Sequence, residues 1–273
     1  MKKLKIGIVG CGAIGSSLAG AIVKDFKRQA QLGALFDIDN NKAKGLSKKL
    51  SGGPGLAAAN LRQLIARSEL IVEASSAKVS WDIAKTVLSA GKSVMIMSVG
   101  GIAKRLARLT ALAEHNRAKV YIPSGALCGI DGLKASRMGR IKRVILTTTK
   151  NPASFKGVRY VEAKRIDLDR MKKDTVLFSG KAGEAVKYFP QNINVAAVLS
   201  LAGIGVNNTQ VRIIASPRVT QNIHEVRVES VAGTITTRTE NVLHPANPKT
   251  SYLAVLSAIA MLKQILEPIK IGT

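Results

Sequence analysis

Residues 4–15 read LKIGIVGCGAIG, an apolar run that leads directly into a glycine-rich loop. The run predicts a buried strand, and the pattern from 16 to about 28 predicts a helix after the loop. In G-x-G-x-x-G, the first glycine permits a tight turn, the second lets the backbone approach a pyrophosphate, and the third allows close helix–strand packing. The helix N-terminus also attracts phosphate charge. The stretch therefore predicts a dinucleotide site, and its expected contacts are Gly10, Gly12, Ala13, Ile14 and Gly15.

A second predicted strand, at 32–36, ends in Asp37. An acidic residue about 20 residues beyond the glycines is expected to hydrogen-bond the adenosine ribose of a dinucleotide. A carboxylate pairs with a free 2′-hydroxyl and repels a 2′-phosphate, so Asp37 favours NAD. Lys42 and Lys44 follow closely and weaken that preference, so NADP stays open as a cofactor.

Strands and helices continue to alternate as far as residue 122. Further strands are predicted at 70–73, 93–97 and 119–122, with helices between them. This alternation predicts a Rossmann-type, doubly wound parallel sheet. Ligands bind beyond the carboxyl ends of such strands, so the backbones of 73–75 and 98–101 are expected to flank the nicotinamide. Ordinary turns of small residues explain the same two segments equally well.

A glycine-rich passage at 123–132 ends this pattern. Beyond it the predicted strands alternate apolar and polar residues, as antiparallel strands do, and helices are predicted at 182–188 and 194–202. The expected fold class is α/β, with two domains. A dinucleotide-binding Rossmann domain spans 1–122, and an α+β catalytic and dimerisation domain with a mainly antiparallel sheet spans 123–249. The last predicted helix has an apolar face that includes Leu253 and Leu256, and the segment 250–273 is expected to pack back on the first domain.

The charge of the chain is its most unusual property. Lys and Arg number 42 against 17 Asp and Glu, a formal net charge of +25 over 273 residues. Such an excess suggests nucleic acid or an anionic membrane as a partner. The charges are spread over both domains, however, and aromatic residues make up 4%, too few for the stacking platform of a single-strand binder. We expect a basic surface, no dedicated nucleic-acid site and no membrane partner; the excess of Lys and Arg in 134–187 has no explanation in the pattern.

The two cysteines, Cys11 and Cys128, cannot build a disulfide framework. Together with the three histidines they show no metal-ligand spacing, so we expect no metal. Unpaired cysteines fit a reducing, cytoplasmic location. Cys128 has no basic partner in the pattern and is interpreted as a small apolar filler.

Two polar residues of the second domain are candidates for the chemistry. His224 shares a strand face with Val226 and Val228, which places a titratable ring among buried side chains. Histidine suits the base that a dehydrogenase needs, but a satisfied core histidine fits the same pattern. Asn194 falls in the first turn of an otherwise apolar helix, where its amide binds either a neighbouring loop or a ligand such as a nicotinamide carboxamide.

These residues resemble the L-aspartate dehydrogenase family over almost the whole chain. The matching segments are GCGAIG at 10–15, EAS at 73–75, PSGA at 123–126, FPQNINVAA at 189–197, Asn-x-His at 222–224 and NPKTS at 247–251. The resemblance implies that His224 is catalytic and that Ala126 and Asn194 contact the nucleotide. It also implies a homodimer built through the sheet of the second domain.

The resemblance further implies NAD- or NADP-dependent oxidation of L-aspartate to iminoaspartate. The imine then hydrolyses to oxaloacetate and ammonia or enters NAD biosynthesis, of which this reaction would be the first step. Lys249 and Thr250 are candidates for the substrate carboxylates, because they precede a helix N-terminus. Three alternatives remain: another Rossmann amino-acid dehydrogenase, a non-catalytic nucleic-acid-binding Rossmann module, and a reductase like dihydrodipicolinate reductase, whose paired histidines are missing before Pro123.

Overall fold

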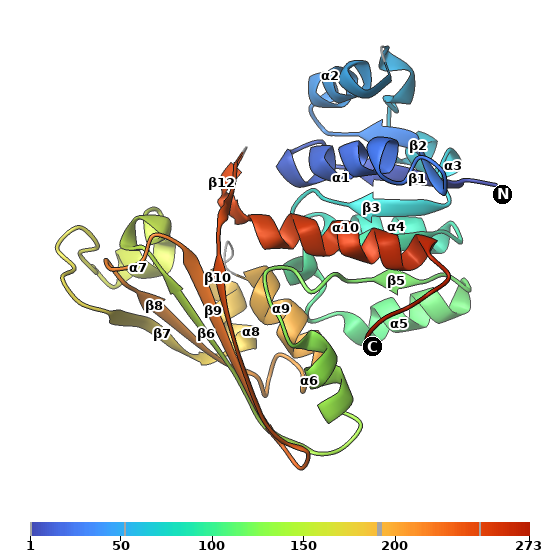
Figure 1. Ribbon diagram of the computed structural model, residues 1–273. Coiled ribbons are helices and arrows are strands. Elements are labelled where there is room, and N and C mark those ends of the chain that lie inside the picture. The colour runs from blue at the N-terminus through green and yellow to red at the C-terminus, as the bar shows by residue number, and fades with distance from the viewer. Residues whose placement is uncertain (1, 52, 190–192, 246) are drawn as a thin grey trace. The chain divides into compact units, whose positions relative to one another are not determined.

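The computed structural model in Figure 1 describes residues 2–51, 53–189, 193–245 and 247–273. The chain divides into two compact units. The first unit comprises Met1–Pro123 with Val255–Ile271, and the second comprises Ser124–Ala254 with Gly272–Thr273.

The first unit is built on a five-stranded, fully parallel sheet with the order β2-β1-β3-β4-β5. Its strands are β1 (Leu4–Val9), β2 (Ala30–Phe36), β3 (Leu70–Glu73), β4 (Ser93–Ile96) and β5 (Val120–Tyr121). Consecutive residues such as Ile71 and Val72 are both fully buried, so β3 is covered on both faces. That burial explains why the strands are continuous apolar runs and confirms the doubly wound parallel sheet.

Helices follow the strands of the first unit. They are α1 (Ala13–Lys24), α2 (Asn40–Ser51), α3 (Leu61–Ala66), α4 (Ser80–Ser89) and α5 (Leu106–His115), with single 3-10 turns at Pro54–Leu56 and Val99–Gly101. Asn60 determines where α3 begins, because its side chain is the N-cap and accepts a hydrogen bond of 2.9 Å from the Gln63 amide.

The last helix, α10 (Tyr252–Leu266), supplies Ala258 and Leu262 to the core of the first unit. The prediction that the face with Leu253 and Leu256 is the packed face of this helix was wrong, because Leu253 is 36% and Leu256 is 43% exposed. The helix is apolar around most of its circumference, so spacing alone cannot select the buried stripe.

The second unit is built on a mixed, mostly antiparallel sheet with the order β10-β9-β6-β8-β7, in which only β6 and β8 pair in parallel. Its strands are β6 (Ile141–Lys150), β7 (Thr175–Lys181), β8 (Gln210–Ala215), β9 (Asn222–Ser230) and β10 (Gly233–Asn241). A short hairpin follows, formed by β11 (Leu243–His244) and β12 (Asn247–Ser251). The expected α+β unit with a mainly antiparallel sheet is confirmed.

One face of this sheet, here called the inner face, is covered by helices (Figure 1). The helices of the unit are α6 (Ile130–Ser136), α7 (Arg159–Ala163), α8 (Ala182–Tyr188) and α9 (Ile193–Ala202), with a 3-10 turn at Pro152–Phe155. Leu199 of α9 and Ala185 of α8 share one core cluster with Leu146 of β6 and Val226 of β9. The outer face carries the alternate residues of the same strands.

Candidate active site

The glycine loop connects β1 to α1 and shows which glycines the fold itself requires. Gly10 has φ +94°, and a Cβ there would collide with the carbonyl of Ala74. A Cβ on Gly15 would collide with the Gly10 carbonyl. Gly12 differs, because a Cβ there would meet nothing within 4 Å. The open space at Gly12 is the room that a pyrophosphate needs beside a helix N-terminus, so the loop fits a dinucleotide cofactor.

The loop is fixed to the end of β2 by Asp37. The amide of Cys11 donates to Asp37 Oδ2 at 2.7 Å, and the amide of Asp39 donates to Oδ1 at 2.9 Å. Each carboxylate oxygen keeps a further lone pair, so Asp37 can hold the loop and still accept from a ribose hydroxyl. Burial, and then the charge of Asp37, raise the pKa of the Cys11 thiol to about 12, so Cys11 stays protonated and unreactive.

A buried carboxylate joins the two segments that were predicted to flank the nicotinamide. Glu73 ends β3 and is fully buried. Its Oε1 accepts from the amide and hydroxyl of Ser75 at 2.8 and 2.7 Å, and its Oε2 accepts from the amide of Ser98 at 3.0 Å. Glu73 therefore connects the loops after β3 and β4 at the carboxyl edge of the sheet, where ligands of this fold bind.

His224 lies on the inner face of the sheet in the second unit. Its side chain is 3% exposed, and its Nδ1 lies 3.0 Å from the hydroxyl of Thr148 on β6. Burial lowers the pKa of His224 to about 3, and the positive charge of Lys150 contributes to the lowering. The imidazole is therefore neutral at physiological pH, which is the form that can accept a proton.

The neighbours of His224 form a polar area on an otherwise apolar face. In the registers of the sheet, Thr148, His224 and Thr239 lie side by side on β6, β9 and β10. Asn222 pairs with Asn241 one row further along, and both are buried. Sequence reasoning missed the contribution of Thr148, Thr239 and Asn241, which only the strand register brings to His224.

Ala126 is held by this polar area. Its carbonyl accepts hydrogen bonds from Thr239 Oγ1 at 3.1 Å and from Asn241 Nδ2 at 3.2 Å. The Thr239 hydroxyl is also 3.3 Å from the carbonyl of His224. Asn241 Oδ1 is buried and has no hydrogen-bond partner among the described residues. The structure thus brings Ala126 and His224 together through Thr239.

The remaining predicted residues also belong to the second unit. Asn194 is exposed in the first turn of α9. Thr250 accepts from Asn247 Nδ2 at 3.1 Å, while the side chain of Lys249 is outside the described part of the chain. Asn192, whose amide side chain and position before the α9 helix suit an N-cap, falls outside the described residues. Cys128 is exposed, so its interpretation as an apolar filler was wrong. Gly129 directly after it has φ +77°, a left-handed conformation that glycine adopts readily in turns.

The described residues contain no group of three or more His, Cys, Asp or Glu side chains that could hold a metal ion. Within the same part of the chain, every helix is too short or too polar to cross a membrane.

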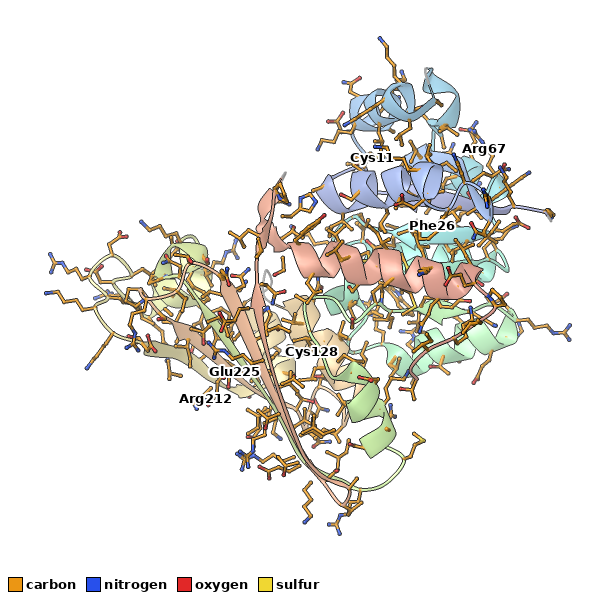
Figure 2. The ribbon with its side chains drawn as sticks, viewed as in Figure 1. Cys11, Phe26, Arg67, Cys128, Arg212 and Glu225 are labelled. Atoms are coloured by element: carbon orange, nitrogen blue, oxygen red, sulfur yellow. The ribbon has the colours of Figure 1, made fainter. Side chains whose placement is uncertain are left out.

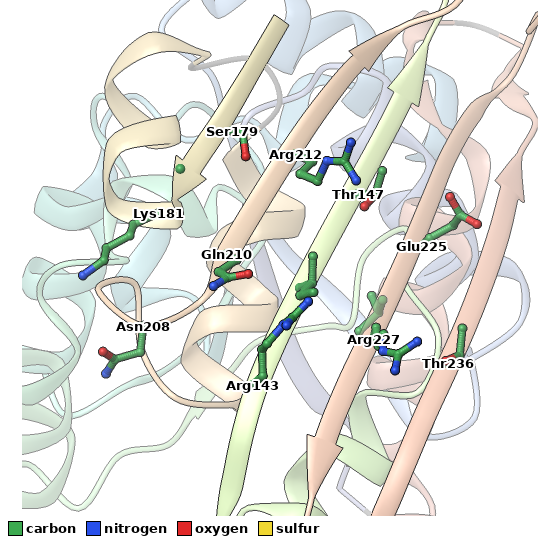
Figure 3. A pocket seen from close by; sticks show the side chains of 13 residues that line it. Arg143, Thr147, Ser179, Lys181, Asn208, Gln210, Arg212, Glu225, Arg227 and Thr236 are labelled. Atoms are coloured by element: carbon green, nitrogen blue, oxygen red, sulfur yellow. The ribbon is translucent and has the colours of Figure 1, made fainter. Parts of the chain in front are cut away.

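The outer face of the sheet carries a hollow of about 600 Å³. Arg143, Lys181, Arg212 and Arg227 line it together with one carboxylate, Glu225 (Figure 3). Figure 2 marks Arg212 and Glu225 on the same sheet. Because Glu225 and Arg227 alternate with the inner-face residues of β9, this hollow lies on the face opposite His224.

The burial of His224 predicts an acid-sensitive stability. Between pH 6.5 and about 3 the unfolded histidine binds a proton and the folded one does not, so stability falls as the pH falls through this window. At about 1.4 kcal/mol per pKa unit, the contribution reaches up to about 5 kcal/mol. Urea denaturation at pH 7 and pH 4 should therefore show a smaller acid loss in His224→Asn than in the wild type. His115→Asn, an exposed control, should behave as wild type; equal losses in all three proteins would contradict the prediction.

Comparison with known proteins gives consistent results in both units. Residues 10–123 match the family model described as homoserine dehydrogenase, NAD binding domain, and residues 131–265 match aspartate dehydrogenase, C-terminal. L-aspartate dehydrogenase of Methanosarcina mazei is 47% identical over 99% of this chain and 100% of the relative. The enzyme of Nitrosopumilus maritimus is 38% identical over 98% of this chain and 99% of the relative.

Solved structures agree. The crystal structure of aspartate dehydrogenase from Thermotoga maritima matches with a TM-score of 0.75 at 27% identity and covers 99% of this chain and 100% of that chain. A homoserine dehydrogenase from Thiobacillus denitrificans matches with a TM-score of 0.63 at 14% identity, covering 97% of this chain and 74% of that chain. The second match is a likeness of fold alone.

Proposed function

The chain belongs to the L-aspartate dehydrogenase family, and from this premise we propose that it oxidises L-aspartate to iminoaspartate with NAD(P), with NAD preferred. The observation that carries the proposal is the neutral, buried imidazole of His224 beside Thr148. Gly10, Gly12, Ala13, Ile14 and Gly15 would hold the pyrophosphate, and Asp37 the adenosine ribose. Ala126 and Asn194 are assigned to the same nucleotide.

When bound, NAD(P) supplies the acceptor for the hydride that leaves the substrate Cα. The protein must meanwhile remove a proton, because the α-amine of aspartate arrives as an ammonium ion. His224 accepts that proton at Nε2, directly or through water. For Nε2 to be the acceptor, Nδ1 must carry the hydrogen and donate it to Thr148 Oγ1, 3.0 Å away. Thr148 therefore orients the base, and its hydroxyl oxygen can accept this hydrogen.

An amino-acid panel tests the proposal. Purified protein should reduce NAD, and NADP less efficiently, when L-aspartate is added, and should show no comparable rate with malate, glutamate or homoserine. Reduction with another amino acid in preference to aspartate would assign the chain to a different substrate. No reduction with any of them, together with salt-sensitive duplex binding, would favour a nucleic-acid-binding module.

We assign the outer face of the second unit to a homodimer contact. Alternate residues of β6 and β8, including Ile145 and Ile214, present apolar surface on this helix-free side. Two-fold pairing is the commonest assembly and uses one surface twice. The arginines of the hollow must then find acceptors in the partner, and Glu225 and Thr236 supply them on the same face.

This contact predicts a mass in solution of about twice the 28.9 kDa chain. Ile145→Asp places a charge in the hollow and should shift the protein to a monomer in light scattering. Val231→Asp is the matched control, since Val231 is 64% exposed at the β9–β10 turn and away from the hollow-lining residues. A monomeric wild type, or a dimer that Ile145→Asp leaves intact, would contradict the assignment.

The family resemblance and the chemistry of the product support two further assignments. Iminoaspartate, the product of the reaction, is a precursor for NAD biosynthesis, and we propose that the reaction is the first step of that pathway. We also place the enzyme in the cytoplasm, where both NAD and aspartate are available and where free thiols such as those of Cys11 and Cys128 persist.

A further inference from the structure

Lys150 is the last residue of β6 and continues the alternation of the inner face. Val144, Leu146 and Thr148 are buried at every second position of this strand, and Lys150 is next in phase. Its partner on β8 is the small, fully buried Ala215. A long amine side chain therefore lies beside a short one, with Thr148 and His224 in the preceding row.

The side chain of Lys150 is half-buried and has no counter-charge among the described residues. Burial lowers its pKa to about 8, yet it takes part in none of the ion pairs formed by the described residues. Glu225 of β9 and Glu240 of β10 lie on the opposite face of the sheet and pair with Arg238 at 3.0 and 2.8 Å. An unpaired cation is costly to bury, so a site that retains one is arranged for an anionic ligand.

We propose that Lys150 binds a carboxylate of the substrate while His224 receives the proton of the substrate amine. This inference rests on the proposed function. Like charges exclude the substrate ammonium from the Lys150 end of the site, which leaves the neutral His224 for the amine. Successive rows of a strand face lie about 6.6 Å apart, a spacing at which one amino dicarboxylate reaches both side chains.

The variant Lys150→Met tests the proposal. The KM for L-aspartate should rise at least ~30-fold, as expected for loss of a charge-assisted contact, with a smaller change in kcat. Lys142→Met is the matched control, because Lys142 lies on the same strand but is exposed; its KM should stay within about twofold of wild type. The thermal midpoint of Lys150→Met should equal or exceed that of the wild type, since an unpaired buried charge is removed.

The two carboxylates are distinguished with L-asparagine and L-isoasparagine as competitive ligands. Each amide lacks one carboxylate, so the amide whose inhibition constant is unaffected by Lys150→Met identifies the carboxylate that Lys150 holds. If Lys150→Met lowers the midpoint, Lys150→Gln, which keeps polarity and lacks the charge, must give the same rise in KM. An aspartate KM within about threefold of wild type in both variants, or equal losses for aspartate and both amides, overturns the inference. A wild type that does not oxidise aspartate overturns instead the proposed function.

Discussion

Replacing His224 with asparagine lowers the turnover number with L-aspartate by ~10²–10⁴-fold, the range expected for loss of a general base. The dissociation constant of NAD should change by less than about threefold, because the variant leaves the glycine loop and Asp37 intact. Stopped-flow reduction of NAD by aspartate measures the first quantity, and quenching of protein fluorescence measures the second.

A second substitution separates proton transfer from packing around His224. Thr148→Val removes the oxygen 3.0 Å from Nδ1 but leaves the ring in place. Its loss of turnover should be about tenfold, the cost of one misoriented hydrogen bond, and clearly smaller than that of His224→Asn. Near-normal turnover in His224→Asn would show that His224 is not the general base, whatever the effect of Thr148→Val.

Substitutions of Gly12 and Gly15 should have opposite effects. Gly12→Val should fold with a thermal midpoint close to wild type, because its Cβ position is empty, yet its NAD affinity should fall at least ~30-fold as the side chain occupies the pyrophosphate site. Gly15→Val forces a side chain onto the Gly10 carbonyl, so its midpoint should drop by roughly 5 °C or more. Differential scanning calorimetry and NAD titration decide both. Unchanged NAD affinity in a folded Gly12→Val would place the cofactor elsewhere.

The first unit could be predicted closely because its signals are local. A strand, a glycine loop with fixed spacing and a terminal acidic residue lie within about 40 residues, and each has one structural meaning. The hydrogen bond between Cys11 and Asp37 follows from that order. The connection that Glu73 makes between the loops after β3 and β4 could not be predicted in this way, because it needs the pairing of β3 with β4 to bring Ser98 within reach.

In the second unit, the pairing register of the strands determines which side chains lie together, and the sequence pattern does not reveal that register. The alternating pattern predicts a strand at 143–149, which stops one residue short of Lys150. The structure continues β6 through Lys150 and thereby places its amine in phase with Thr148. Likewise α6 and α7, with seven and five residues, are too short to show a helical period and were not predicted.

The structure explains part of the net charge of +25. Within the basic segment 134–187, Arg143 and Lys181 line the outer hollow and Lys150 lies on the inner face. One stretch of chain therefore supplies positive charge to both faces of a single sheet. Because the proposed ligands of the enzyme are anions, such a surface should speed their capture and make the rate constants sensitive to salt.

In the proposed reaction, this chain removes a hydride from Cα of L-aspartate and a proton from its amine. A single-turnover reaction with L-[2-²H]aspartate and NAD tests it most directly. We expect the deuterium to be recovered at C4 of the reduced nicotinamide in the wild type, and His224→Asn to form the same labelled product ~10²–10⁴-fold more slowly. Reduced cofactor without deuterium, or equal rates in the two proteins, would contradict it.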